Sequence, residues 1–193
     1  MKETREVLRA KILEGAIALF MEKGIEKVTT RELTEHLGIS RSHIYHYFRD
    51  WETLTKEAMG HYLLQDRTAF SATITGLNSA QRLTAFVANY LPATPDASWQ
   101  IYSSLWQLAI HDTEWANMAE GMMDQWQTML ADIIREGVDA GEFTSPDPDL
   151  VARQLGAMLN GYADQLILSP TAATHQAATR DIGAFICMAL RVS

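Results

Sequence analysis

Residues 28–48 read VTTRELTEHLGISRSHIYHYF, and this stretch decides the fold of the N-terminal part of the chain. Thr29 and Glu32 have the spacing of a capping box, in which the two side chains bond backbone amides at the start of a helix. Gly38 predicts the end of that helix, because glycine readily takes the left-handed conformation found at such ends. Ser40 can cap a second short helix. Helix, glycine-containing turn and helix in this order is the pattern of a helix-turn-helix motif.

The second short helix, which is predicted to end at about Tyr47, has an apolar side and a polar side. Ile44 and Phe48 lie four residues apart on one face and can hold the helix against the rest of the domain. The other side carries residues whose side chains can hydrogen-bond, namely Arg41, Ser42, His43, Tyr45, His46 and Tyr47. Such groups suit base edges and phosphates. A tight helical corner, in which the aromatic residues only pack, is the alternative.

The rest of the chain shows helical periodicity and no convincing alternation of strand type, so the predicted fold class is all-α with about nine helices. A first helix should end at Gly24, and Asp50 should cap a helix that starts at Trp51. Further helices are predicted over residues 78–90, 98–110, 114–140 and 147–168, and from 171 to the end, with a proline-containing break at 92–95.

Composition and charge exclude several classes of protein. No apolar run among the 193 residues approaches the ~18 residues of a membrane span, so no membrane partner is expected. The N-terminal segment alternates charges where a secretion signal would need an apolar stretch, and the lone Cys187 has no partner for an internal disulfide. These features predict a cytoplasmic protein.

The net charge of −8 is unevenly distributed along the chain. Residues 1–60 hold ten Lys and Arg against ten Asp and Glu, so the whole negative excess lies in residues 61–193. The N-terminal part is therefore the one that could approach a polyanion without strong repulsion.

The sequence offers little support for catalysis. Cys187 has no base near it in the sequence, the His and carboxylate residues lack metal-ligand spacing, and there is no glycine-rich phosphate loop. We therefore expect no enzyme activity, no cofactor and no metal. Two alternatives stay open, which are an all-α enzyme and a helical protein–protein adaptor, each retaining the helix-turn-helix as a scaffold.

Residues 12–48, ILEGAIALFMEKGIEKVTTRELTEHLGISRSHIYHYF, and the ETL that follows at 52–54 resemble the DNA-binding domain of the tetracycline-repressor (TetR) family of bacterial regulators. The resemblance implies base contacts by Arg31, Arg41, Ser42, His43 and Tyr45, and phosphate contacts by Thr30, His46 and Tyr47. His43 departs from the usual Thr or Ser. Trp51 stands where a phosphate-binding Lys is common, and we include it in the DNA-binding set.

The C-terminal part resembles the ligand and dimer domain of the same family. SSLWQLAIHDTEW (103–115) and EGVDAGEFTSPDPDLVARQLGAMLNGY (136–162) look most like the branch of choline- and betaine-responsive repressors. The resemblance implies a helix-turn-helix DNA-binding domain over 1–50 and a ligand-binding and dimerisation domain over 51–193. It also implies a homodimeric repressor that a small-molecule inducer releases from a pseudo-palindromic DNA operator.

Two stripes of aromatic and Met residues, one on each of the helices predicted at 98–110 and 114–140, are candidates for the inducer site. Trp and Met suit an adaptable cavity, although the same stripes could be ordinary core. The predicted ligand set is Trp99, Tyr102, Trp106, Gln107, Met122, Trp126 and Met129. Asp124 points away from Trp126 on the predicted helix, and no carboxylate falls on either stripe, so the pattern does not predict a charge-paired amine site.

The last two predicted helices carry apolar stripes that a single chain could bury internally. The family resemblance implies that they form a four-helix bundle across a two-fold dimer. The predicted dimer set is Val151, Leu155, Met158, Leu159, Tyr162, Leu166, Ile182, Phe185, Ile186 and Ala189.

Overall fold

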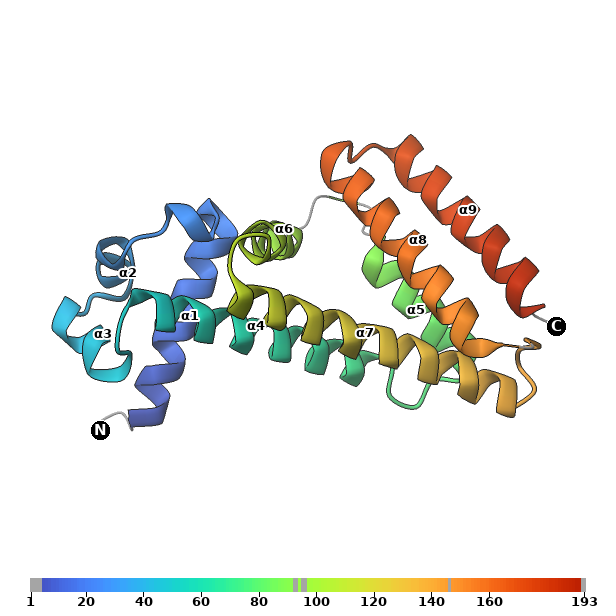
Figure 1. Ribbon diagram of the computed structural model, residues 1–193, viewed down its shortest axis with the longest axis horizontal. Helices are drawn as coiled ribbons and strands as arrows, with labels where there is room; N and C mark the ends of the chain where they lie inside the picture. The colour runs from blue at the N-terminus through green and yellow to red at the C-terminus, as the bar shows by residue number, and fades with distance from the viewer. Residues whose placement is uncertain (1–4, 92–93, 95–96, 146, 192–193) are drawn as a thin grey trace. The chain divides into compact units, whose positions relative to one another are not determined.

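The computed structural model describes residues 5–91, 94, 97–145 and 147–191. Within these ranges the chain forms α-helices, one short 3-10 helix and no strand (Figure 1). The helices are α1 (Arg5–Lys23), η1 (Ile25–Lys27), α2 (Thr30–Leu37), α3 (Arg41–Tyr47), α4 (Trp51–Thr73), α5 (Ser79–Tyr90), α6 (Ala97–Ala109), α7 (Thr113–Asp139), α8 (Pro148–Leu168) and α9 (Ala172–Leu190). The predicted all-α class with an N-terminal helix-turn-helix is confirmed.

Local capping sets the ends of these helices. Thr29 and Glu32 form the predicted capping box of α2, and Gly38 ends that helix with a left-handed φ of 65°. The predicted starts and ends of α5 to α8 differ from the observed ones by one residue at most. The last helix, predicted to run to the end, stops at Leu190 because Arg191 takes a left-handed φ of 42°. The predicted break at 92–95 lies outside the described residues apart from Thr94.

The chain divides into two compact units. Unit 1 comprises Met1–Ala69 and Ala97–Glu120, and unit 2 comprises Phe70–Asp96 and Gly121–Ser193. Helices α4 and α7 contribute residues to both units. The division of roles predicted at residue 50 stays a prediction. Among the described helices, none combines the length and hydropathy that a membrane span requires.

Helix α1 is the centre of unit 1, where it packs against α2, η1 and α6. Its apolar face is fully buried at Ile12, Ala16 and Phe20. Gly15 allows a close approach to α2, because a Cβ built at Gly15 would lie only 2.7 Å from Leu37 Cδ2. This packing fixes α2 and, through α2, the second helix of the motif, α3.

Unit 2 is built around aromatic rings and the helix α8. The rings of Phe70, Phe86 and Trp126 contact one another with centroids 5.4–5.8 Å apart. Such tilted and edge-on pairs add to the stabilisation from buried area. Helix α8 packs against both α5 and α9 (Figure 1).

Candidate functional site

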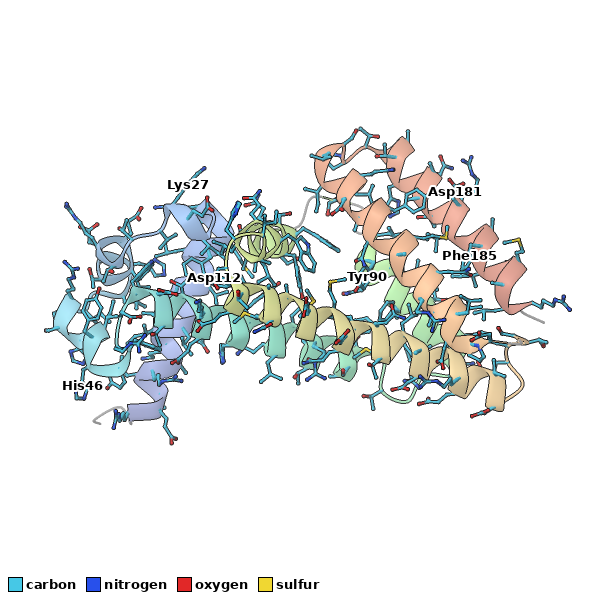
Figure 2. All side chains as sticks on the ribbon, in the orientation of Figure 1. Lys27, His46, Tyr90, Asp112, Asp181 and Phe185 are labelled. Atoms are coloured by element: carbon cyan, nitrogen blue, oxygen red, sulfur yellow. The ribbon has the colours of Figure 1, made fainter. Side chains whose placement is uncertain are left out.

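Helix α3 presents a polar surface because its apolar residues are turned inward. Ile44 is 0% exposed and Phe48 is 2% exposed, as the i, i+4 spacing predicts. The remaining positions are exposed at Arg41, Ser42, His43, Tyr45 and His46 and half-buried at Tyr47. In Figure 2, the side chain of His46 projects outward from α3. The helix therefore offers a row of hydrogen-bonding groups to solvent.

Caps before and after α3 hold this short helix in place. The Ser40 hydroxyl accepts a hydrogen bond from the backbone N–H of His43 at 3.3 Å. Asp50 in turn accepts one from the backbone N–H of Thr53 at 2.8 Å, at the start of α4. Hydrogen bonds from Thr53 and from Arg49 lower the pKa of the Asp50 carboxyl to about 2. The carboxylate is therefore ionised at neutral pH and caps the helix that follows α3.

The base of α3 is also supported from α1 and α4. The guanidinium of Arg9 lies 5.1 Å from the centre of the Phe48 ring, which is a cation–π distance. The same guanidinium forms an ion pair with Glu57 on α4. These contacts fix Phe48, and Phe48 ends the helix.

The polar groups on α2 and α3 contact one another. The hydroxyls of Tyr45 and Thr30 lie 3.3 Å apart, and the Arg41 guanidinium lies 5.6 Å from the centre of the Tyr45 ring. The hydrogen bond with Thr30, followed by one with Arg41, lowers the pKa of the Tyr45 phenol. The rings of His43 and Tyr47 stack at 6.3 Å. Arg41 and Tyr45 are thus partly oriented without a bound partner.

Two further predicted DNA contacts lie on α2 and at the start of α4. Arg31 is exposed, and its Nε bonds Glu35 at 2.8 Å, one turn along α2. This bond raises the pKa of Arg31. The ion pair is solvated and weak, so Arg31 can exchange Glu35 for another anion. Trp51 is half-buried as the first residue of α4.

The predicted ligand residues of unit 1 lie on α6, and Tyr102 among them contacts two side chains of α4, Tyr62 and Asp66. The Tyr102 hydroxyl donates to the Asp66 carboxylate at 2.5 Å. The Tyr102 ring lies 6.1 Å from that of Tyr62 and 5.8 Å from that of Trp99. Aromatic faces next to a carboxylate can hold an organic cation. Trp106 is half-buried, and Gln107 is exposed.

The carboxylate of this cluster comes from a helix that the stripe pattern does not include. The spacing of Trp99 and Tyr102 predicts a shared face on α6 but does not reveal which helix packs against it. Tyr62 and Asp66 lie four residues apart and therefore on the same face of α4. This spacing is the one feature of the sequence that indicates an aromatic ring beside a carboxylate on that helix. The sequence predicted no carboxylate on either stripe, and the carboxylate that bonds Tyr102 comes from α4, outside both stripes.

The predicted ligand residues of unit 2 lie on α7. Met122 and Trp126 are buried, and Met129 is half-buried. Trp126 contacts the rings of Phe70, Phe86 and Tyr90, which is the packing of a core residue and supports the alternative interpretation of its stripe. A single cavity lined by residues of both units stays a prediction.

The predicted dimer residues fall into two groups. Val151, Leu155, Leu159, Leu166 and Ile182 are buried within the single chain, whereas Met158, Tyr162, Phe185, Ile186 and Ala189 are half-buried. The Tyr162 hydroxyl also donates to Asp181 at 2.9 Å. Only the second group, with neighbours such as the 72% exposed Met188, leaves surface for a partner chain.

Lys56 links the start of α4 to Asp112, between α6 and α7, and to Glu114 in the first turn of α7. Its Nζ lies 2.7 Å from Glu52, 3.6 Å from Asp112 and 2.5 Å from Glu114. Glu114 and Glu52, the main causes, raise the pKa of Lys56 well above its usual value. The ammonium therefore stays charged and holds the two segments of unit 1 together.

Within the described ranges, the His, Cys, Asp and Glu residues form no group of three that could bind a metal.

Comparison with known proteins identifies both parts of the chain. Residues 12–58 match the family described as bacterial regulatory proteins of the tetR family, and residues 79–191 match the BetI-type transcriptional repressor C-terminal family. The transcriptional repressor KstR2 of Mycobacterium tuberculosis is 27% identical over 151 residues, which are 75% of this chain and 74% of that protein. An uncharacterized regulator of Bacillus subtilis, YfiR, is 25% identical over 157 residues, covering 76% and 73% of the two chains.

The fold is also that of solved regulators. A transcriptional regulator from Saccharomonospora viridis, crystallised in complex with choline, superposes with a TM-score of 0.82 over 94% of this chain and 96% of its own at 22% identity. These relatives are regulators, so the expectation that the chain is not an enzyme is confirmed. Because the BetI-type match covers more than half of the sequence and the helix-turn-helix lies in the tetR match, the chain belongs to the TetR family and is a transcriptional repressor with an N-terminal DNA-binding domain.

Proposed function

We propose that the protein is a cytoplasmic, homodimeric repressor that binds a pseudo-palindromic operator and leaves it when a small molecule binds. Each chain supplies one α3 to a major groove, and the two half-sites lie about 34–36 Å apart, one turn of the DNA. The observation that carries this proposal is the surface of α3, where five exposed polar residues surround a fully buried Ile44. A helix that served only as a scaffold would have no need of that composition.

Arg41 is the best candidate for reading a base. Replacing it with Ala should weaken binding to the selected operator by about 1–3 kcal/mol, because a bidentate contact to guanine is lost, and should relax the base preference at one position in each half-site. The operator would first be selected from a randomised DNA pool, and affinities measured at fixed salt concentration by fluorescence anisotropy.

Lys27→Ala provides the control for this measurement. Lys27 is exposed on η1 and outside the predicted DNA-binding set, so its replacement removes the same charge without touching α3 (Figure 2). It should change operator affinity less than Arg41→Ala does. A parent protein that binds operator and random DNA equally would contradict the proposed function.

The contacts in unit 1 support a route from ligand to DNA. An effector held by Trp99, Tyr102 and Asp66 would contact both α6 and α4. Only two residues separate Phe48, which ends α3, from the start of α4. Since α4 is bonded through Lys56 to Asp112 and Glu114, which follow α6 in the chain, a shift of α6 would be transmitted toward the recognition helix α3. The effector would then act by favouring one of two arrangements of the dimer.

We further propose that this effector is an organic cation, and we use choline as the first probe. The Asp66→Asn variant should need roughly tenfold more choline to release labelled operator, because a partly buried ion pair with the ammonium is lost. Ligand-free operator affinity should be unchanged. Asp124→Asn, which removes an exposed carboxylate from α7, is the matched control. Equal choline responses in the parent and Asp66→Asn proteins, or none in either, would refute a cation site at Asp66.

A further inference from the structure

Unit 2 contains a pocket that is separate from the aromatic residues of α6. It has a volume of about 390 Å³ and lies between the facing sides of α5 and α9. This volume falls in the range of roughly 300–1,000 Å³ that is usual for small-molecule sites. The lining residues are Ala80, Leu83, Thr84, Val87 and Ala88 of α5, Leu91 directly after α5, Phe143, and His175, Thr179, Ile182, Gly183, Ile186 and Cys187 of α9.

The pocket lies beside α8, which packs against both α5 and α9 and holds the two helices. Helix α8 packs against each of them and contributes no residue to the lining. Small residues widen the gap on both walls, with Ala88 on α5 and Gly183 on α9. A Cβ built at Gly183 would have no atom within 4 Å. The buried Phe143 closes part of the pocket.

The chemistry of the lining selects against charged molecules. Among the residues that the structure describes, the lining contains no Asp, Glu, Lys or Arg. The His175 ring nitrogen already pairs with the Leu91 carbonyl at 2.9 Å, and the Thr84 hydroxyl donates to the Ala80 carbonyl at 2.9 Å. An ion in this pocket would lose hydration without gaining a counter-charge. An uncharged, mostly hydrocarbon molecule would lose little and would gain apolar contacts.

We infer that the α5–α9 pocket is a second ligand site, which takes an uncharged, hydrophobic small molecule. This second site does not depend on the cation site proposed at Asp66. All residues that line the α5–α9 pocket belong to unit 2, whereas Asp66 belongs to unit 1. Ile182 and Ile186 belong both to the lining and to the predicted dimer set, so an occupant would contact α9, one of the two helices predicted to form the dimer.

A neutral fluorescent probe, N-phenyl-1-naphthylamine, tests this inference on the full-length protein. The parent should bind it saturably with one probe per chain. Gly183→Leu places a side chain into the pocket and should weaken binding roughly tenfold or more. The variant should fold, because Leu favours a helix more than Gly does and the space is open. Ala88→Phe fills the opposite wall and gives a second, independent variant.

Ala184→Leu is the matched control, since Ala184 is exposed on α9 next to Gly183 and is absent from the lining. It should bind the probe like the parent. Asp66→Asn should also bind the probe normally, whatever its response to choline, so failure of one site is distinguishable from failure of the other. Saturable binding that is unchanged in both Gly183→Leu and Ala88→Phe would overturn the inference, as would the absence of saturable binding in the parent.

Cys187 gives a second readout at the same place. It is the only cysteine of the chain, it is exposed, and it lines the pocket. Its reaction with Ellman's reagent should slow by roughly tenfold when the probe saturates the parent, and it should not respond to the probe in Gly183→Leu. A thiol that is unreactive from the start and insensitive to the probe would indicate that the partner chain fills the pocket, which also overturns the inference.

Discussion

Phe185→Asp is expected to convert the protein to a monomer and to lower its operator affinity by about 100-fold or more. Phe185 lies half-buried on α9, so part of its ring remains available to a partner chain (Figure 2). A carboxylate at that position would be buried without a counter-ion in the dimer, which is strongly unfavourable. The operator affinity falls because a single recognition helix reads only one half-site. Sedimentation at micromolar concentration, followed by operator titration, measures both effects.

Gln176→Asp controls for the added charge. Gln176 is exposed on the same helix and outside the predicted dimer set, so this variant should remain dimeric and bind the operator like the parent. Thermal unfolding of the two variants would separate loss of the dimer from loss of the fold. A monomeric parent that binds its operator tightly would contradict the proposed dimer.

Ile44→Asp should abolish operator binding while the C-terminal helices stay folded. Replacing a fully buried Ile by a smaller side chain removes about 2–5 kcal/mol of stability, and a buried, unpaired carboxylate adds to that loss. Helix α3 has only seven residues and would not remain docked without this contact. We expect a fall in operator affinity of about 100-fold or more, measured by anisotropy with circular dichroism as the test of helix content.

Ile44→Val is the conservative control for this position. It removes one methyl group at a cost of about 0.5–1.5 kcal/mol, so the operator affinity should change only a few-fold. If Ile44→Asp bound the operator as tightly as the parent, another surface of the protein would have to contact the DNA.

The sequence predicts the helices and the polar side of α3 well because their determinants are local. The capping box of Thr29 and Glu32, the left-handed Gly38 and the i, i+4 pair of Ile44 and Phe48 each act within a few residues. Their structural consequences follow from propensity and periodicity without knowledge of the tertiary fold.

The candidate ligand and dimer residues depend on which helices pack together, and a single sequence does not encode that information in any local pattern. Asp66 joins Tyr102 across 36 positions of the chain, and no spacing rule connects the two. Leu155 and Ile182 fit an intermolecular stripe as well as an internal one, yet both are buried within one chain. Periodicity finds the apolar side of a helix but not its neighbour.

The separation of inward and outward residues on α3 also bears on how such repressors diverge. Ile44, Phe48 and the two flanking caps dock the helix, whereas the exposed residues lie on the opposite side, where Tyr45 adds a surface contact with Thr30 of α2. Mutations at the exposed positions can therefore accumulate after gene duplication with little penalty in folding. A duplicated copy could acquire a new DNA target by substituting a few surface residues, and the same positions are the natural ones to randomise when engineering an altered operator preference.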